Sequence, residues 1–364
     1  MKIASFNIQC VSVPMAEPHR TASGVVSASP LVLLTVTTDT GVKGHSIVFT
    51  YTPAALKPTA ALMANLESMV VGQSLAPAAL WAQLHARFRL LGTQGLVGMA
   101  LAGIDMALWD ALARAHQLPL YALLGSTAKV LRPYGAVGFD GATDSARAAE
   151  AWARRGFQGV KAKIGYPTVA EDVAAIRAMR TAVGPDVALM VDYNQSLAPT
   201  EAESRLGVLD AEIGPAGLAW IEEPVLAHDF SALAQLAGKT CIALQAGENW
   251  WGPLDFRHAL NAGARDLLMP DVMKCGGVTG WQQVAAMASV YGVPVSNHLW
   301  PEISAQLLSA TPTAAIPGSW LEYADWWNPV LRDPLVVTDG CAVFDGVIGS
   351  GIEFNDSAVQ RLLV

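Results

Sequence analysis

The sequence predicts an α/β fold in which a closed barrel of parallel strands follows a smaller α+β domain. From about Leu131 onward, short apolar segments alternate with helical segments eight times, which is typical of a barrel built from strand and helix pairs. Residues 1 to about 50 instead have the pattern of strands, and residues 53–124 have apolar positions at helical spacing. With 364 residues, 52% of them hydrophobic and 15% charged, the chain is long and apolar enough for a large core.

The first 124 residues predict a small sheet followed by about three helices. In the stretch LVLLTVTTDTGVKGHSIVF, two apolar runs flank a turn at residues 39–41, so a hairpin is expected there. Breaks at GQSLAP and LLGTQG divide the helical region that follows. The end of the chain returns to turn-rich strand segments in TDGCAVF and DGVIGSGIEF.

Polar side chains stand at the ends of seven of the eight predicted barrel strands. The strands cover residues 133–139, 159–164, 187–194, 218–224, 241–248, 266–272, 293–298 and 319–324. The active site of such a barrel lies at the C-terminal ends of its strands, so these side chains are expected to meet at one mouth. They are Lys161, Lys163, Asp192, Asn194, Glu222, Glu223, Glu248, Asp271, His298 and Glu322.

Composition and charge argue against several classes of protein. The net charge of -8, without a basic run, argues against nucleic acid as a partner. The longest apolar tract, residues 95–115, contains Asp105 and Asp110 and is expected to be a core helix rather than a membrane span. The N-terminus lacks the apolar block of a signal peptide, which favours the cytoplasm. The four cysteines are far apart, so neither a disulfide nor a zinc framework is expected.

Three carboxylates at consecutive strand ends predict a metal site. Asp192, Glu222 and Glu248 form an all-oxygen set that suits Mg²⁺ and suits zinc poorly. Any one of them alone is better explained as a cap of the following helix. Because all three stand in otherwise apolar runs on adjacent strands, the metal is favoured.

Two lysines and a histidine stand at strand ends beside these carboxylates. Lys161 and Lys163 point to the same face of a predicted buried strand and need counter-charges, which the three carboxylates supply. Asp271, one strand before His298, is expected to fix the tautomer of that imidazole and raise its basicity. A structural core histidine is the alternative.

These residues resemble the enolase superfamily, in its mandelate racemase branch. The resemblance rests on KAK, DYNQS, WIEEP, GENW, MPDVMKCGGVTGW and NHLWPEISAQLLSATPTA, which occur in the family's order and spacing. It continues through SIVFTYTPAALK and GIDMALWDALA, and AIPGS before Trp320 is an insertion. It implies a modified TIM barrel of the (β/α)7β type in residues 126–328, an α+β capping domain in residues 1–125, and a C-terminal segment, 329–364, that packs back on the cap.

The resemblance also implies roles for the strand-end residues. One Mg²⁺ per subunit is held by the three carboxylates and binds the carboxylate and 2-hydroxyl of the substrate. Lys163 and the His298–Asp271 pair face opposite sides of the α-carbon as acid/base catalysts. For Lys163 in that role, the cation of Lys161 two residues away is expected to lower the pKa, so that Lys163 acts as a neutral base. Lys161 and Glu322 contact the substrate carboxylate, with Glu322 as a hydrogen-bond donor to the enediolate. Asn194 contacts the 2-hydroxyl.

The resemblance places a substrate pocket between the barrel mouth and a mobile loop, residues 17–30. Phe49 and Tyr51 match aromatic residues that wall the pocket, and Val26 lies in the loop beside them. The remaining pocket positions depart from the family pattern and put the substrate in question. They are His19, Ser23, Ala136 and Tyr323.

The predicted activity is abstraction of the α-proton of a 2-hydroxy carboxylate, leading to racemisation of mandelate or a related apolar acid. Two alternatives stay open: a dehydratase that converts sugar acids into 2-keto-3-deoxy acids with the same residues, and a non-catalytic barrel that binds carboxylates. The predicted partners are a small-molecule carboxylate and further copies of the chain, from a dimer to an octamer, with no nucleic acid and no membrane.

Overall fold

The computed structural model describes residues 1–21, 24–264, 266–315 and 317–364, and it begins with a capping domain of three strands and four helices. Strands β1 (Ile3–Thr21), β2 (Gly24–Thr38) and β3 (Lys43–Phe49) form an antiparallel sheet in that order. Helices α1 (Pro53–Val70), α2 (Pro77–Arg87), α3 (Gly95–Ala115) and the short α4 (Leu120–Leu123) follow. The predicted hairpin between residues 31 and 49 is confirmed, with Leu31 paired to Phe49 across it.

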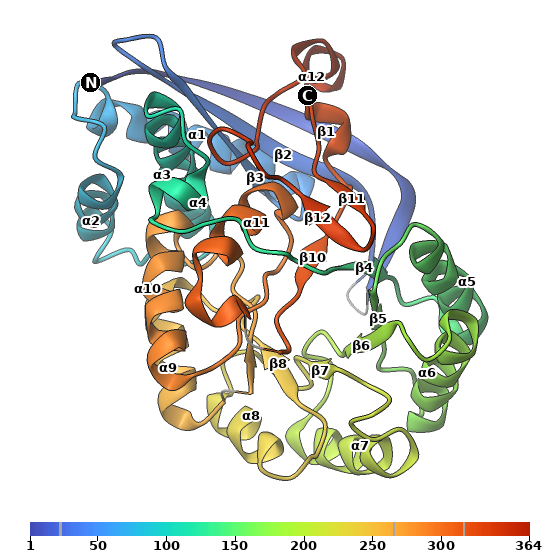
Figure 1. Cartoon of the computed structure of the whole chain (residues 1–364). Coiled ribbons are helices and arrows are strands. Elements are labelled where there is room, and N and C mark those ends of the chain that lie inside the picture. Colours follow the sequence, from blue (N-terminus) through green and yellow to red (C-terminus); the bar gives the residue numbers. More distant parts are fainter. Residues whose placement is uncertain (22–23, 265, 316) are drawn as a thin grey trace.

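Residues 17–21 and 24–30, the described part of the segment predicted as a mobile loop, are instead strand residues in the outer part of a long hairpin. His19 pairs with Val26 and Arg20 with Val25, so the described residues of 17–30 continue strands β1 and β2. The register shifts between Pro14 and His19, where Pro18 cannot donate to the ladder. The hairpin reaches over the barrel (Figure 1), and Phe139 N donates to Arg20 O at 3.0 Å to join its outer part to the loop after β4.

Helix α3 is apolar because it is the core helix of the cap. It is long and apolar enough to cross a membrane, and the only helix of this kind in the described part of the chain, but 78% of its most apolar window is buried inside the protein. It packs against β3, α1 and α10, and its Asp105 and Asp110 are buried with hydrogen-bond partners. Burial on several sides accounts for the hydropathy that the sequence shows.

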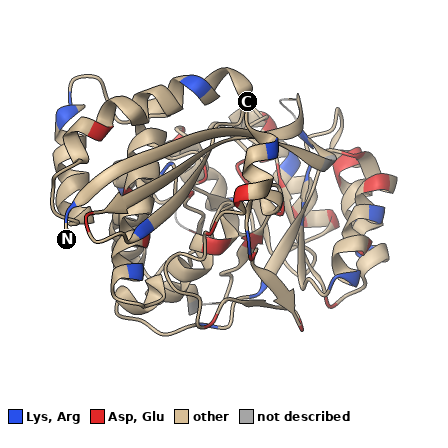
Figure 2. Ribbon diagram, turned by 90° about the horizontal axis from the view of Figure 1, so that it is seen from above, with Lys and Arg blue, Asp and Glu red and all other residues tan. Residues whose placement is uncertain are grey.

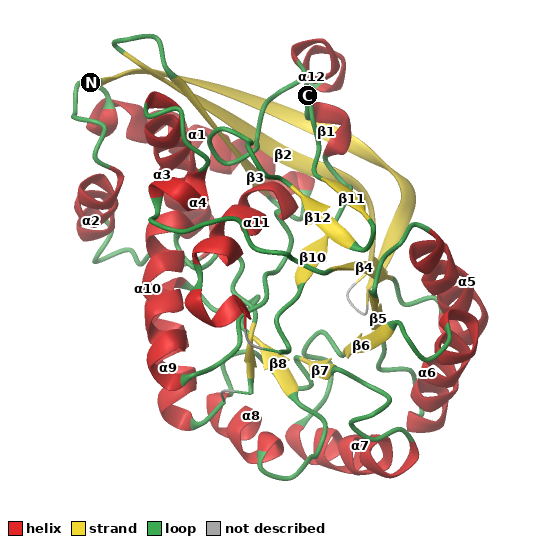
Figure 3. Cartoon of the chain, in the orientation of Figure 1, coloured by secondary structure: helices red, strands yellow, loops and turns green. Residues whose placement is uncertain are grey.

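The barrel strands form a parallel sheet in the order β10-β4-β5-β6-β7-β8-β9. The strands are β4 (Pro133–Val137), β5 (Gly159–Lys163), β6 (Ala188–Asp192), β7 (Trp220–Glu222), β8 (Leu244–Ala246), β9 (Leu267–Leu268) and β10 (Leu321–Tyr323). The helices are α5 (Gly141–Arg154), α6 (Val169–Val183), α7 (Pro199–Glu212), α8 (Phe230–Ala237), α9 (Gly252–Ala262), α10 (Gly277–Tyr291) and α11 (Pro301–Ala310). Figure 3 shows helices α5 to α10 outside the curved sheet, so the α/β barrel class is confirmed.

The seventh predicted strand, residues 293–298, is not a regular strand. It makes two isolated parallel bridges with the β9 side, Leu268 with Val295 and Asp271 with His298. Pro294 has no N–H, which weakens a regular ladder there. On the β10 side, side chains replace backbone pairing: Asn297 Oδ1 accepts from Glu322 N at 2.9 Å, and Ser296 Oγ accepts from Trp320 N at 3.0 Å. The barrel therefore closes through these side chains.

The C-terminal segment returns to the cap through β11 (Val336–Thr338), β12 (Cys341–Val343) and α12 (Asp356–Leu362). Val364 N donates to Cys10 O at 3.1 Å, and Leu120 N donates to Gly349 O at 2.8 Å. The predicted boundary at 328/329 divides a 3-10 turn, Asn328–Val330. Figure 2 shows basic and acidic residues interspersed along the outer helices.

Replacing Gly135 with alanine should lower the free energy of unfolding by about 1 to 3 kcal/mol, because the added Cβ would lie 2.2 Å from the indole of Trp152. Gly207, in the middle of α7, has nothing within 4 Å of the same added atom. Gly207→Ala should therefore raise the free energy of unfolding by up to about 1 kcal/mol through helix propensity. Urea denaturation of both variants tests the pair, and equal effects would contradict this account of β4 packing.

Candidate active site

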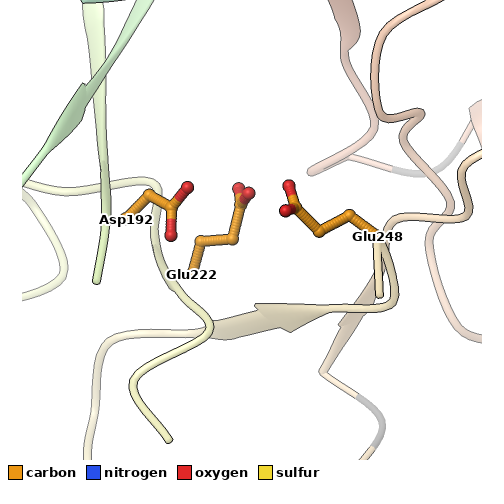
Figure 4. Close-up of side chains that lie close together, drawn as sticks. All are labelled: Asp192, Glu222 and Glu248. Atoms are coloured by element: carbon orange, nitrogen blue, oxygen red, sulfur yellow. The ribbon is translucent and has the colours of Figure 1, made fainter. Parts of the chain in front are cut away.

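The three predicted metal ligands meet at the barrel mouth. Asp192 ends β6, Glu222 ends β7, and Glu248 follows β8 after Gly247. The parallel register pairs Asp192 with Glu222, so both side chains point to the same face of the sheet. The three carboxylates are buried, turn toward one another (Figure 4), and each offers an oxygen within 4.8 Å of the others.

The surroundings of the triad fit a divalent cation. Oε2 of Glu248 and Oδ1 of Asn194 are buried and accept no hydrogen bond, which leaves oxygen lone pairs for a ligand. Burial raises the pKa of Glu222 well above its usual value, and the charges of Asp192 and Glu248 add to this effect. The buried carboxylates here outnumber the buried lysines: Asp192, Glu222, Glu223, Glu248, Asp271 and Glu322 surround Lys161, Lys163 and Lys274. Oxygen donors with excess negative charge suit Mg²⁺.

The paired lysines of β5 are buried and bonded to carboxylates, as their position predicted. Lys161 Nζ lies 2.7 Å from Glu222 Oε1 and 2.9 Å from Glu322 Oε1. Lys163 donates to Asp192 Oδ2. Val160 and Ala162 point the other way into the core between sheet and helices. The lysines therefore belong to the site and are not a solvated face.

The predicted lowering of the pKa of Lys163 is wrong. Burial lowers the pKa of Lys163, and Lys161 lowers it as expected, but the carboxylates of Asp192, Glu248 and Glu222 together raise it above its usual value. The pKa of Lys161 is also raised well above its usual value: burial lowers it, but Glu222 and Glu322 prevail. Spacing along a strand predicted the cation nearby but not the direct ion pair across the sheet.

His298 and Asp271 form the expected pair. His298 Nδ1 lies 2.7 Å from Asp271 Oδ2, and since a carboxylate only accepts, Nδ1 carries the proton. Nε2 faces the triad, 3.2 Å from Glu248 Oε2. The other oxygen of Asp271 accepts from Trp300 Nε1 at 3.0 Å and from Met273 N at 2.7 Å. These bonds fix the carboxylate and leave Nε2 free to take a proton at the site.

Glu322 and Asn194 lie at the site, each beside a partner. Glu322 accepts from Leu299 N at 2.8 Å as well as from Lys161. Burial raises its pKa, but Lys161 and His298 lower it below the usual range, so Glu322 is an ionised acceptor here, and its donor role stays a prediction. Asn194 Nδ2 donates to Asp192 Oδ2 at 2.9 Å, and its backbone lies in the left-handed region with a φ of 46°.

A row of aromatic rings forms one wall beside these groups. Phe49 lies 4.6 Å from Tyr51 and 6.0 Å from Trp326 between ring centroids, and Trp326 lies 5.0 Å from His19. Tyr51 OH reaches Asp271 Oδ2 at 3.4 Å, so the row ends at the His298 pair. The indole of Trp326 was not predicted as a pocket residue, because WW in the sequence looks like ordinary core.

His19 connects this wall to a cavity of about 600 Å³ between the hairpin, α5 and residues 325–329. Ala136 lines the same cavity and pairs with Lys161 in register, so both point into the barrel. Burial lowers the pKa of His19 to about 3, with Lys163 adding to the effect, so its imidazole is neutral at pH 7. Val26 is the cross-strand neighbour of His19 on the same face of the hairpin.

Two predicted pocket positions have other outcomes. Ser23 lies outside the described residues. Tyr323 is not a pocket residue, because it follows Glu322 in β10 and points to the opposite face of the sheet. Its ring packs against Phe157 at 5.2 Å, and its hydroxyl donates to Leu335 O at 3.3 Å. A strict two-residue alternation from Glu322 would have identified this orientation from the sequence.

The sequence analysis also missed a buried amide and a buried lysine behind the triad. Asn249 Nδ2 donates to Glu223 Oε2 at 2.8 Å and to Glu248 Oε1 at 3.0 Å. Lys274 Nζ donates to Asn249 Oδ1 at 2.7 Å and lies 4.7 Å from the centre of the Tyr51 ring. Lys274 follows the strand end by three residues and therefore was not among the strand-end residues.

Comparison with known proteins decides the family. Residues 3–125 match the mandelate racemase / muconate lactonizing enzyme N-terminal domain, and residues 144–358 match the enolase C-terminal domain-like family. The chain belongs to the mandelate racemase / muconate lactonizing enzyme family of the enolase superfamily. The predicted superfamily and the prediction that the protein is an enzyme are thereby confirmed.

The relatives in this family catalyse several different reactions. A D-galactarolactone cycloisomerase of Agrobacterium fabrum is 31% identical over 99% of this chain and 98% of its own. An enolase from Bradyrhizobium, complexed with magnesium and mandelic acid, is 43% identical with a TM-score of 0.93, over 100% of this chain and 98% of its own. An L-talarate dehydratase from Polaromonas, complexed with Mg and L-glucarate, is 26% identical with a TM-score of 0.89, over 100% and 97%. With the triad geometry, the two magnesium complexes confirm the predicted cofactor class.

Proposed function

We propose that this enzyme racemises mandelate or a closely related aromatic 2-hydroxy acid with Mg²⁺ as cofactor. The observation that carries the proposal is the position of two bases at opposite ends of one carboxylate row, beside an aromatic wall. Lys163 contacts Asp192 at one end, and His298 lies by Glu248 at the other. A substrate held at the row would thus meet one base on each side of its α-carbon.

The chain's own residues account for the proton chemistry. The α-proton of a carboxylate is very weakly acidic, so the enediolate must be stabilised as it forms. Asp192, Glu222 and Glu248 would hold Mg²⁺, which supplies positive charge to the substrate's oxygens when bound. Lys161 places a second cation beside Glu322, and the Asp271 carboxylate stabilises the imidazolium of His298 after proton transfer. Return of a proton from the opposite base inverts the centre.

The aromatic wall supports an aryl substrate. The ring centroid of Phe49 lies 4.6 Å from that of Tyr51 and 6.0 Å from that of Trp326. Rings at these distances offer faces and edges against which a further aromatic ring packs favourably. The Bradyrhizobium enolase complexed with mandelic acid adds support, since it is 43% identical to this chain.

Dehydration of a sugar acid is the second candidate, favoured by His19. Its neutral imidazole can hydrogen-bond a hydroxyl, and an aryl group that left it unpaired would cost about 1 to 3 kcal/mol. Several relatives support this reading, such as the L-talarate/galactarate dehydratase of Salmonella typhimurium, 30% identical over 74% of this chain and 66% of its own. If the substrate carries a leaving group β to its carboxylate, the same two bases would catalyse elimination.

A paired assay separates the two candidates. Polarimetry with each enantiomer of mandelate should show loss of rotation in the presence of Mg²⁺. A panel of aldonic and aldaric acids should yield no 2-keto-3-deoxy product. Keto-acid formation from any sugar acid, without loss of rotation from mandelate, would replace racemisation by dehydration.

Trp326→Ala should raise KM for mandelate by roughly 10- to 100-fold, because it removes an aromatic surface worth a few kcal/mol from the wall. Tyr323→Phe is the matched control, since this buried ring packs outside the barrel. Its KM should equal that of the wild type. Steady-state kinetics of both variants measure the difference, and a change in Tyr323→Phe alone would reverse the assignment of the wall.

A further inference from the structure

Helix α3 of the capping domain supplies the N-terminal cap of a barrel helix. Asp105 is 2% exposed and accepts from Thr279 N at 2.9 Å and from Thr279 Oγ1 at 2.6 Å. Thr279 lies in the first turn of α10, whose own preceding residue, Gly276, offers no side chain as a cap. Trp109 Nε1 donates to the same Thr279 hydroxyl at 2.8 Å. The carboxylate thus satisfies an amide that a helix start leaves without an internal partner.

The backbone around the contact between Asp105 and Thr279 is closely packed. Gly277 has a φ of 76°, and an added Cβ there would lie 2.4 Å from Asp105 Oδ2. Gly276 has a φ of 103°, and its carbonyl accepts from Trp81 Nε1, on α2, at 2.8 Å. Two helices of the cap therefore hold the start of α10 from two directions.

The held segment also carries the aspartate of the catalytic pair. Asp271 O accepts from Cys275 N at 2.8 Å, and Gly277 N donates to Val272 O at 2.7 Å, so residues 271–277 form one closed turn. Within that turn, Lys274 N donates to Asp271 Oδ1 at 3.1 Å. The orientation of the Asp271 carboxylate depends on the turn, and the orientation of His298 depends on that carboxylate.

We propose that Asp105 is a positioning residue for the His298–Asp271 pair, acting from the capping domain through Thr279 and the 271–277 turn. The cap would then set the geometry of one base in addition to covering the site. Lys163 stands on β5, away from this turn, and is not coupled to Asp105 by these contacts. The effect on the two bases should therefore be unequal.

The proposal rests on the two-base racemase function, and it is tested by measuring each base separately. The exchange of the α-proton of each mandelate enantiomer with D₂O is followed by ¹H NMR, and Lys163→Ala and His298→Asn identify which enantiomer depends on which base. Asp105→Asn and Thr279→Val should slow the His298-dependent exchange by roughly 10- to 100-fold, the size of effect expected from a small displacement. The Lys163-dependent exchange should stay near the wild-type rate. Thr279→Ser keeps the hydroxyl and should restore the first rate.

Asp110→Asn is the matched control. Asp110 lies on the same helix, is fully buried, and accepts from His45 N at 2.8 Å and Ser350 N at 2.6 Å, contacts that do not involve α10. At equal folded fraction it should leave the ratio of the two exchange rates unchanged. Equal slowing of both exchanges in Asp105→Asn, or the same selective slowing in Asp110→Asn, would overturn the proposal.

A second readout does not depend on turnover. The Nδ1 proton of His298, assigned by its loss in His298→Asn, should shift or broaden in the ¹H NMR spectrum of Asp105→Asn and keep its position in Asp110→Asn. If the wild type exchanges no proton of mandelate, the proposed function fails and this spectrum still decides the role of Asp105. An unchanged His298 signal in Asp105→Asn would overturn the positioning role even in an active racemase.

Discussion

Glu248→Gln is expected to abolish turnover, with a loss on the order of 10³-fold or more, while the fold is retained. The amide is isosteric with the carboxylate but removes one of the three carboxylates that share the buried site. Mg²⁺ gives up bound water reluctantly, and negatively charged ligands compensate for that loss. The affinity for Mg²⁺ should therefore be the property that Glu248→Gln lowers most. The wild-type enzyme should lose activity to a chelator and recover it when Mg²⁺ is returned.

Thermal unfolding tests the binding step without an activity assay. Mg²⁺ should raise the Tm of the wild type in a concentration-dependent manner, because it binds the folded state, and should not raise that of Glu248→Gln. Glu302→Gln is a suitable control, since Glu302 is a buried carboxylate outside the triad that accepts from Trp327 Nε1 at 3.2 Å. Its response to Mg²⁺ should match the wild type. Full turnover in excess chelator would refute the metal assignment.

The grouping of the strand-end residues at one site could be predicted because the barrel fold allows only one arrangement of these strand ends. Charged residues at the C-terminal ends of consecutive buried strands must share a mouth, and a barrel brings Asp192, Glu222 and Glu248 together whatever the loops do. The partnership of His298 with Asp271 followed from the same argument, since the two lie on neighbouring barrel positions. Local periodicity was sufficient for these residues because the backbone alone determines where they point.

Other features depend on contacts that periodicity does not encode. The side chains of Ser296 and Asn297 close the seventh barrel position. The alternation of residues along a strand does not predict such side-chain contacts. The pKa of Lys163 depends on an ion pair with Asp192 across the sheet, which outweighs its neighbour in sequence. Lys274 lies within a helix-capping turn, so its burial beside Tyr51 required the capping domain to be in place.

The long hairpin shows why a loop was the wrong expectation for the described part of residues 17–30. Pro18 and the small polar residues lower strand propensity locally. The buried, continuous apolar run from Leu31 to Leu34 nevertheless holds β2 against β1, and the pairing of the two strands continues outward to His19 and Val26. The hairpin thereby carries His19 to the ring of Trp326, 5.0 Å away between ring centroids, which is why the proposed choice between the two substrate classes involves this residue.

Single replacement of each base is expected to separate the two halves of the reaction. Lys163→Ala should lose exchange of the α-proton of one mandelate enantiomer with D₂O, and His298→Asn that of the other, each by on the order of 10²- to 10⁴-fold. Racemisation should stop in both variants, because inversion needs both bases. The reason lies in the structure, where Lys163 and His298 contact carboxylates at opposite ends of one row and share no hydrogen bond in the described residues.

Metal binding must be compared between the two variants before their exchange rates are interpreted. Lys163→Ala removes the cation bound to Asp192, so Mg²⁺ binding is measured first by the same Tm shift, and exchange is compared at saturating metal. His298→Asn keeps a polar group of similar length beside Asp271 and serves the same comparison on the other side. Loss of exchange from both enantiomers in each variant, with metal binding intact, would mean that one base depends on the other. Proton transfer would then follow one route that requires both residues, and Lys163 and His298 would not act as independent bases.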